Sequence, residues 1–177
     1  YKIKGLTHSA NDIIYFETDT KDETIEITWH AEDPIPPVYE VLQKGGGPKG
    51  GTWDKMRAVT LEMAPKPTFS EKNGYNFCYQ ALYDNRGETT TGWKITGDAS
   101  GNQQLITSVH HSFPEHNSLE IVTNNLEAAE VLIKDNNFIS THQKWWHEYY
   151  PLSFVTINDA EKESFYWIQM YKLGSAS

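Results

Sequence analysis

Short runs of β-branched and apolar residues, many alternating with polar ones, occupy the first two-thirds of the chain. The first two runs cover residues 12–18 and 23–32, and the polar residues between them favour a hairpin turn. Prolines at 34, 36 and 37 then break the pattern, since proline cannot donate to a strand ladder. Further runs cover residues 38–43, 56–64, 75–84, 92–99, 103–112 and 118–124. This spacing predicts a mainly β fold, an antiparallel β-sandwich.

The pattern changes to a helical one at Asn124. Residues 124–137 carry apolar positions at helical spacing, and Asn124 is a candidate N-cap. Residues 140–150 read as a second helix, which Ser140 would cap and Pro151 would end. A third helix would start at Asn158 or Asp159. We therefore expect a β-sandwich over residues 1–123 and a helical linker over residues 124–177.

Two aromatic features of the linker indicate a junction between parts of a protein. The last helix is apolar almost all round, which is typical of a helix buried on more than one side. We expect a further domain to pack there; the alternative is a helix buried wholly by the sandwich. In "KWWHEYYP" (144–151), Trp145 and Trp146 would point about 100° apart on one helix, so at least one should be buried.

Composition narrows the class of partner. The 177-residue chain has a formal charge of -9, which argues against a nucleic-acid partner because phosphate binding needs clustered Lys and Arg. No run is long and apolar enough to span a bilayer.

The single cysteine, Cys78, rules out an intramolecular disulfide and a Cys-rich zinc site. Because the chain begins at Tyr1 and not at Met, we expect it to be a piece of a longer protein.

The motifs that carry chemistry are incomplete. "GGGPKGG" (45–51) lacks the order of a phosphate loop, so it reads as a flexible hairpin loop. "HEYYP" (147–151) has Pro151 where a zinc-protease helix needs its second His, and His142 and His147 would point in different directions. No carboxylate pair stands out among 24 acids, and no Gly-x-Ser-x-Gly occurs. The sequence predicts no catalytic residue, metal ligand or cofactor site. Trp53, Trp145 and Trp146 are the candidates for substrate binding.

The tail also resembles a known protein family. The residues that carry the resemblance are His142, Trp145, Trp146, Ser153–Val155, Phe165–Gln169 and Tyr171–Leu173. In this order they resemble the segment joining an N-terminal, supersandwich-like β-sandwich to an (α/α)6 barrel in bacterial proteins similar to glycoside hydrolase family 95, a family of α-L-fucosidases and related enzymes. Residues 27–38 and 50–67 resemble sandwich strands of the same group. The resemblance is specific only in the last forty or so residues.

The resemblance implies a non-catalytic sandwich and linker that support a catalytic barrel further along the same chain. The catalytic carboxylates would then lie in the barrel, and this chain alone would be inactive. A periplasmic or extracellular bacterial location would follow. Two alternatives stay open: a stand-alone carbohydrate-binding module, which exposed aromatic rings would favour, and a purely structural or protein-interaction domain.

Overall fold

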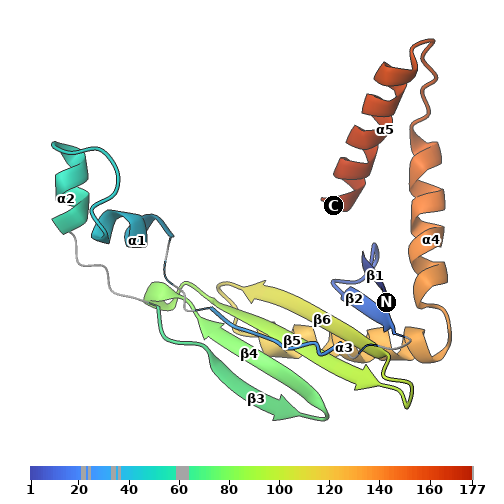
Figure 1. The fold of residues 1–177 in the computed structure, drawn as a ribbon, viewed down its shortest axis with the longest axis horizontal. Coiled ribbons are helices and arrows are strands. Elements are labelled where there is room, and N and C mark those ends of the chain that lie inside the picture. Colours follow the sequence, from blue (N-terminus) through green and yellow to red (C-terminus); the bar gives the residue numbers. More distant parts are fainter. Residues whose placement is uncertain (21–22, 24, 33–34, 36, 59–63, 177) are drawn as a thin grey trace.

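The computed structural model describes residues 1–20, 23, 25–32, 35, 37–58 and 64–176. Six strands form one antiparallel sheet in the order β1-β2-β6-β5-β4-β3 (Figure 1). Their bounds are β1 Lys2–Thr7, β2 Ile14–Asp19, β3 Thr68–Lys72, β4 Tyr75–Ala81, β5 Glu88–Gly97 and β6 Gln103–Ser112. Strands β3 to β6 follow one another as an antiparallel meander, and the β1–β2 hairpin adds to β6.

Helices hold more residues than strands do. Their bounds are α1 Pro37–Gln43, α2 Thr52–Ala58, α3 Ser118–Lys134, α4 Phe138–Tyr149 and α5 Ala160–Ser175, with 3₁₀ turns at Tyr83–Asn85 and Tyr150–Leu152. The antiparallel sheet is confirmed, but the protein belongs to the mixed α/β class and is not mainly β. All strands of the described residues lie in a single sheet.

Helix α3 covers one face of the sheet and forms the core with it. Val122, Leu126 and Ala129 lie at helical spacing and are fully buried. They pack over the middle of β5, where a Cβ on Gly92 would come within 2.6 Å of the Val122 side chain. The absence of a side chain at Gly92 therefore sets how closely α3 approaches the sheet.

The opposite face is crossed by an irregular segment, and this corrects the strand predicted over residues 23–32. Its described part, residues 25–32, has no regular structure. The Trp29 ring stacks on Trp93 of β5 with centroids 4.9 Å apart, and the Ile27 N–H donates to the Gln103 side chain. The predicted hairpin with residues 12–18 is also wrong, because β2 pairs with β1 and β6.

Three other predicted strands contain helix. Residues 38–43 lie in α1, and residues 56–58 lie in α2, while residues 59–63 fall outside the described part of the chain. The glycine-rich residues 45–51 connect these two helices instead of two strands. Residues 118–124 form the first two turns of α3, so the predicted boundary between residues 123 and 124 falls inside the helix that covers the sheet.

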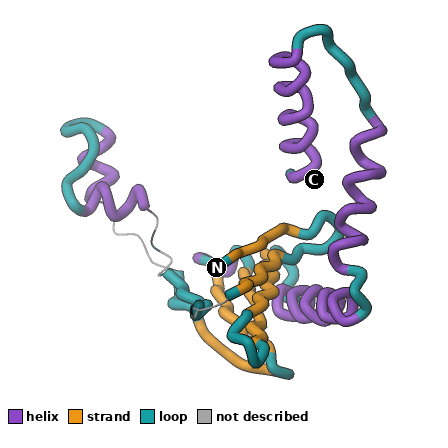
Figure 2. Tube along the Cα trace, turned by 45° about the vertical axis from the view of Figure 1, so that its right-hand side comes forward, coloured by secondary structure: helices purple, strands orange, loops and turns teal. Residues whose placement is uncertain are grey.

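Helices α4 and α5 form an antiparallel pair that stands away from the sheet (Figures 1 and 2). Helix α4 begins at Phe138, two residues before the predicted cap, and the Ser140 hydroxyl donates to the Asn137 carbonyl. Helix α4 ends just before Pro151, as predicted, and a 3₁₀ turn containing this proline follows it. The predicted cap of α5 is confirmed, since the Asp159 carboxylate accepts the N–H groups of Glu161 and Lys162.

Candidate functional site

The aromatic seam between α4 and α5 is built around Trp146. The rings of Tyr150 and Tyr171 both stack on its indole, with centroids 5.4 and 5.5 Å away and interplanar angles of 29° and 21°. Trp145 and Tyr149 meet the same indole edge-on. Protein rings therefore pack on Trp146 both face-on and edge-on. Trp146 packs against the terminal helix, but the prediction that at least one of the two tryptophans is buried is not met, because both are only half-buried.

The rest of the seam fixes how close the two helices lie. Trp145 stacks on Tyr149 at 5.0 Å, and the Tyr149 hydroxyl donates to the Met170 carbonyl of α5 at 3.0 Å. A Cβ at Gly174 would come within about 3 Å of the Trp146 and Tyr149 rings. A glycine at this position therefore permits the close contact.

The three candidate tryptophans do not form one site. Trp53 lies on α2 and is 39% exposed, and α2 lies at the opposite end of the molecule from α4 and α5 (Figure 1). Trp145 and Trp146 are half-buried in the seam. His142 and His147 point in different directions, as predicted: His142 contacts the β1–β2 turn and His147 is exposed.

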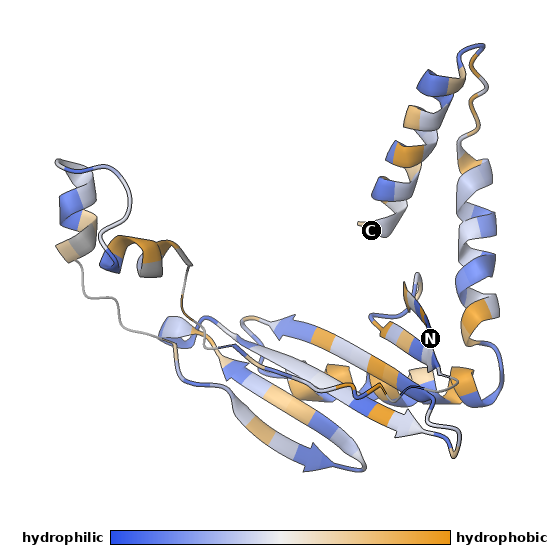
Figure 3. Ribbon diagram, in the orientation of Figure 1, coloured by the Kyte–Doolittle hydropathy of each residue, from blue (hydrophilic) through white to orange (hydrophobic). Residues whose placement is uncertain are grey.

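The outer face of α5 is apolar and uncovered. Phe165 is 64% exposed and Leu173 66% exposed, and Ile168 is 51% exposed. Figure 3 shows hydrophobic residues spaced along α5. The last helix is therefore not buried all round by the rest of this chain. Such a surface is typical of an interaction site.

We expect the purified chain to self-associate through this face. Phe165→Ser combined with Leu173→Ser removes two exposed apolar side chains, so it should shift the sedimentation profile towards monomer. Lys172→Ser, at an exposed position on the same helix, is the matched control and should leave the profile unchanged. A wild-type chain that stays monomeric at every concentration, or a double variant that associates as the wild type does, contradicts the expectation.

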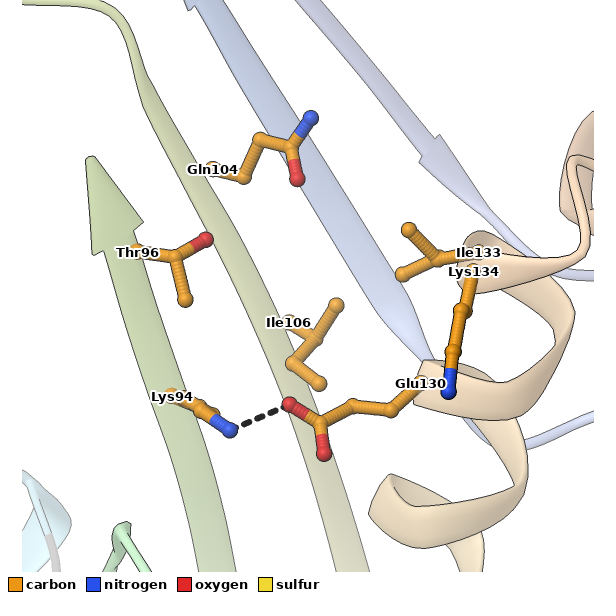
Figure 4. A pocket seen from close by; sticks show the side chains of 7 residues that line it. All are labelled: Lys94, Thr96, Gln104, Ile106, Glu130, Ile133 and Lys134. Carbon is orange, nitrogen blue, oxygen red and sulfur yellow. Dashed lines mark hydrogen bonds and ion pairs between the residues drawn. The ribbon is translucent and has the colours of Figure 1, made fainter. Parts of the chain in front are cut away.

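A cavity of about 320 Å³ lies between the sheet and the second half of α3 (Figure 4). Ile106 forms its floor, and Lys94 and Glu130 form an ion pair at its side. The Tyr75 hydroxyl donates to the other Glu130 oxygen at 2.6 Å. Burial raises the pKa of Glu130, but the bonds from Lys94 and Tyr75 outweigh it and keep that pKa below its usual value. Glu130 is thus an ionised structural group, with both oxygens engaged.

A second carboxylate, Glu88 at the start of β5, caps α3. It is 4% exposed. One oxygen accepts the Ser118 N–H at 3.0 Å and the Ser118 hydroxyl at 2.7 Å; the other accepts the Tyr79 hydroxyl at 2.9 Å and lies 3.1 Å from His116 Nδ1. Burial raises the pKa of Glu88, but these bonds lower it to about 2 overall. Sequence reasoning missed this group because its partners lie up to 30 residues away.

A cleft of about 560 Å³ separates the β1–β2 turn from the α4–α5 pair. Two histidines, His8 of the turn and His142 of α4, lie beside it. Sequence reasoning considered His142 as a metal ligand and as part of the tail motif, but it missed His8, since no local signal links residues so far apart in the chain.

Within the described residues, no three His, Cys, Asp or Glu side chains are grouped so that they could hold a metal ion. In the same part of the chain, no helix has the length and apolarity needed to cross a membrane. Comparisons of the chain with protein-family models, with curated proteins and with solved structures gave no match.

Proposed function

We propose that this chain is the non-catalytic sheet and linker portion of a carbohydrate-active enzyme, a glycoside hydrolase. In this proposal the α4–α5 pair docks on an (α/α)6 catalytic domain of the same protein. The observation that carries the docking role is the outer face of α5, where Phe165, Ile168 and Leu173 are exposed while the inner face is closed by the aromatic seam. A helix domain with an apolar surface is a suitable partner for such a face.

The glycoside hydrolase assignment rests on the tail motifs and not on the geometry. Those motifs include residues that hold the α4–α5 pair together. Trp146 of α4 packs on Tyr171 of α5, and Phe154, in the segment between the two helices, packs on Trp167 of α5. Because the residues that resemble the family also hold the two helices together, they support a linker whose shape is needed for docking.

The two-sheet sandwich is also part of the proposal. The sheet face opposite α3 keeps exposed apolar side chains on several strands, namely Phe16, Phe69 and Val109. The described segment 25–32 lies against this face at Trp93. A second sheet in the whole protein would bury the remaining apolar side chains, as sandwich packing requires.

We expect no turnover of aryl glycosides by residues 1–177. A glycosidase needs one carboxyl group with a raised pKa to act as the acid. Where the pKa of a described carboxylate is shifted, the shift is downward, as for Glu17, Glu88, Asp98, Glu130 and Asp159. Nitrophenol release would measure this directly. Release that disappears when a single Asp or Glu of this chain is replaced would overturn the expectation.

The whole gene product is the positive control for the aryl glycoside assay. If the proposal is right, it hydrolyses an aryl glycoside while residues 1–177 do not, and the reading frame after Ser177 encodes a helical repeat rich in Trp and acidic residues. A reading frame without such a repeat contradicts the proposal.

A stand-alone carbohydrate-binding module is the second candidate. Two observations favour it: Trp53 is 39% exposed on α2, and Trp145 is only half-buried. Aromatic rings of this kind stack on sugars when one face is free. Titration with oligosaccharides separates the candidates, because binding that is lost in Trp53→Ala or Trp145→Ala supports the module and opposes a purely supporting role.

A further inference from the structure

Two histidines join the β1–β2 turn to the N-terminal part of α4. His8 lies in the turn and is 4% exposed, and His142 lies on α4, with ring centroids 5.7 Å apart. The His8 ring also packs on Phe138, the buried first residue of α4, at 4.6 Å. These contacts attach the base of the α4–α5 pair to the sheet.

The hydrogen bonds of both rings fix the same tautomer. The Ala10 N–H donates to His8 Nδ1, and the Ser9 N–H donates to His142 Nδ1, both at 3.1 Å. A backbone N–H is always a donor, so each Nδ1 must be an unprotonated acceptor. The proton of His8 is then on Nε2, which lies 3.1 Å from the Phe138 carbonyl and donates to it. Both rings are therefore neutral in this arrangement.

Protonation would reverse the role of each Nδ1. An imidazolium donates from both nitrogens, so His8 Nδ1 would face the Ala10 N–H, and His142 Nδ1 would face the Ser9 N–H, donor against donor. The two rings would also carry like charges at close range. Burial lowers the pKa of His8 and of His142, and their mutual repulsion lowers that of His8 further, so both stay neutral at neutral pH.

Few charged groups surround the pair. The turn supplies Asp12 and α5 supplies Tyr171 to the cleft, and β2 supplies Tyr15 against Phe138. On α4 itself, Lys144 and Glu148 pair with each other on the exposed side. Within the part of the chain that the structure describes, the ring nitrogens of His8 and His142 bond to main-chain groups, Thr141 and Asn11, and not to a carboxylate that would stabilise an imidazolium.

We propose that His8 and His142 form a pH-sensitive latch that holds the α4–α5 pair against the β1–β2 turn near neutral pH and releases it in mildly acidic solution. The consequence is a docking helix whose orientation depends on pH. The latch is a property of the chain itself and does not depend on the glycoside hydrolase assignment.

The sign of the effect follows from the lowered pKa values. A histidine whose folded-state pKa lies below its usual 6.5 favours the folded contact fully above pH 6.5. That contribution is lost as the pH falls from 6.5 through the folded-state pKa. The release therefore begins below pH 6.5, well above the range in which Glu88 takes up a proton.

Spin labels measure the release directly. One label is placed at Glu161→Cys on α5 and one at Lys72→Cys on β3, in a Cys78→Ser background. The two labels report the distance between the α4–α5 pair and the sheet. We expect one narrow distance at about pH 7.5 and a broad or shifted distribution at about pH 5, with a midpoint below 6.5. The combined variant His8→Gln and His142→Asn keeps acceptor oxygens without a titrating ring, so its distribution should not change over this range.

The control is His147→Gln, an exposed histidine on the same helix, which should behave as the wild type does. A wild-type distribution that is unchanged down to about pH 5, or the same transition in the combined variant, overturns the latch. Nitrogen-15 spectra of the wild type give an answer even if the combined variant does not fold. The latch requires unprotonated Nδ1 in His8 and His142 at neutral pH and titration of both below 6.5; protonated Nδ1 at neutral pH, or titration at 6.5 or above, rejects it.

Discussion

Replacing Trp146 by alanine should unfold the α4–α5 pair, whereas replacing Trp145 should only loosen it. Trp146 contacts four rings of the seam, including Tyr171 of α5. Truncation of a buried Trp costs about 3–5 kcal/mol, and we expect about 3 kcal/mol here because Trp146 is only half-buried. Trp145 stacks mainly on Tyr149 of its own helix, and one such aromatic pair contributes about 1 kcal/mol. Urea unfolding followed by circular dichroism at a helix wavelength measures both losses.

The control for this pair is Trp53→Ala on α2, which lies outside the seam and should leave the helix signal of α4 and α5 intact. Oligosaccharide binding should be measured on the same three variants. If Trp145→Ala and Trp146→Ala both melt at the wild-type temperature while one of them loses sugar binding, the seam is a binding surface and our account of it is wrong.

Acid should destabilise the sheet and α3 in a separate step, and Glu88→Gln should reproduce the loss at neutral pH. The pKa of Glu88 falls from an ordinary 4.5 to about 2 in the folded protein. A shift of this size corresponds to about 3 kcal/mol of unfolding free energy. Because the folded-state pKa is lowered, this contribution is complete above pH 4.5 and is lost as the pH falls towards 2.

An amide at position 88 keeps one acceptor oxygen and places N–H groups either against the Ser118 donors or against the Tyr79 hydroxyl, so it cannot make all the bonds of the carboxylate. We expect Glu88→Gln to lose about 3 kcal/mol at neutral pH and to show a weaker acid transition. Glu127→Gln, at an exposed position of α3, should change neither quantity. Equal stability of Glu88→Gln and wild type across this pH range would mean that the capping carboxylate contributes nothing.

The local sequence pattern was sufficient to predict an element where that element's own residues determine its structure. Residues 103–112 combine β-branched and apolar residues between turn-rich flanks, and they form β6 as predicted. The cap of α5 was predictable because Asp159 and the N–H groups it accepts are close neighbours in the chain.

Prediction failed where distant contacts decide the outcome. Residues 118–124 contain the β-branched run Ile121, Val122 and Thr123, which favours a strand locally. They form helix because Val122 continues the buried stripe of Leu126 and because Glu88 caps the first turn from another element. The seam was predictable from aromatic density alone, but the His8–His142 contact was not, since it depends on how the β1–β2 turn meets α4.

The central claim is that the outer face of α5 docks on another domain of the same protein, and thiol labelling of Leu173→Cys tests it most directly. Leu173 is 66% exposed in this chain, whereas the native Cys78 is buried. Labelling should be fast in residues 1–177 and at least about tenfold slower in the whole gene product, where the partner domain would cover the site. Equally fast labelling in both proteins would contradict the account.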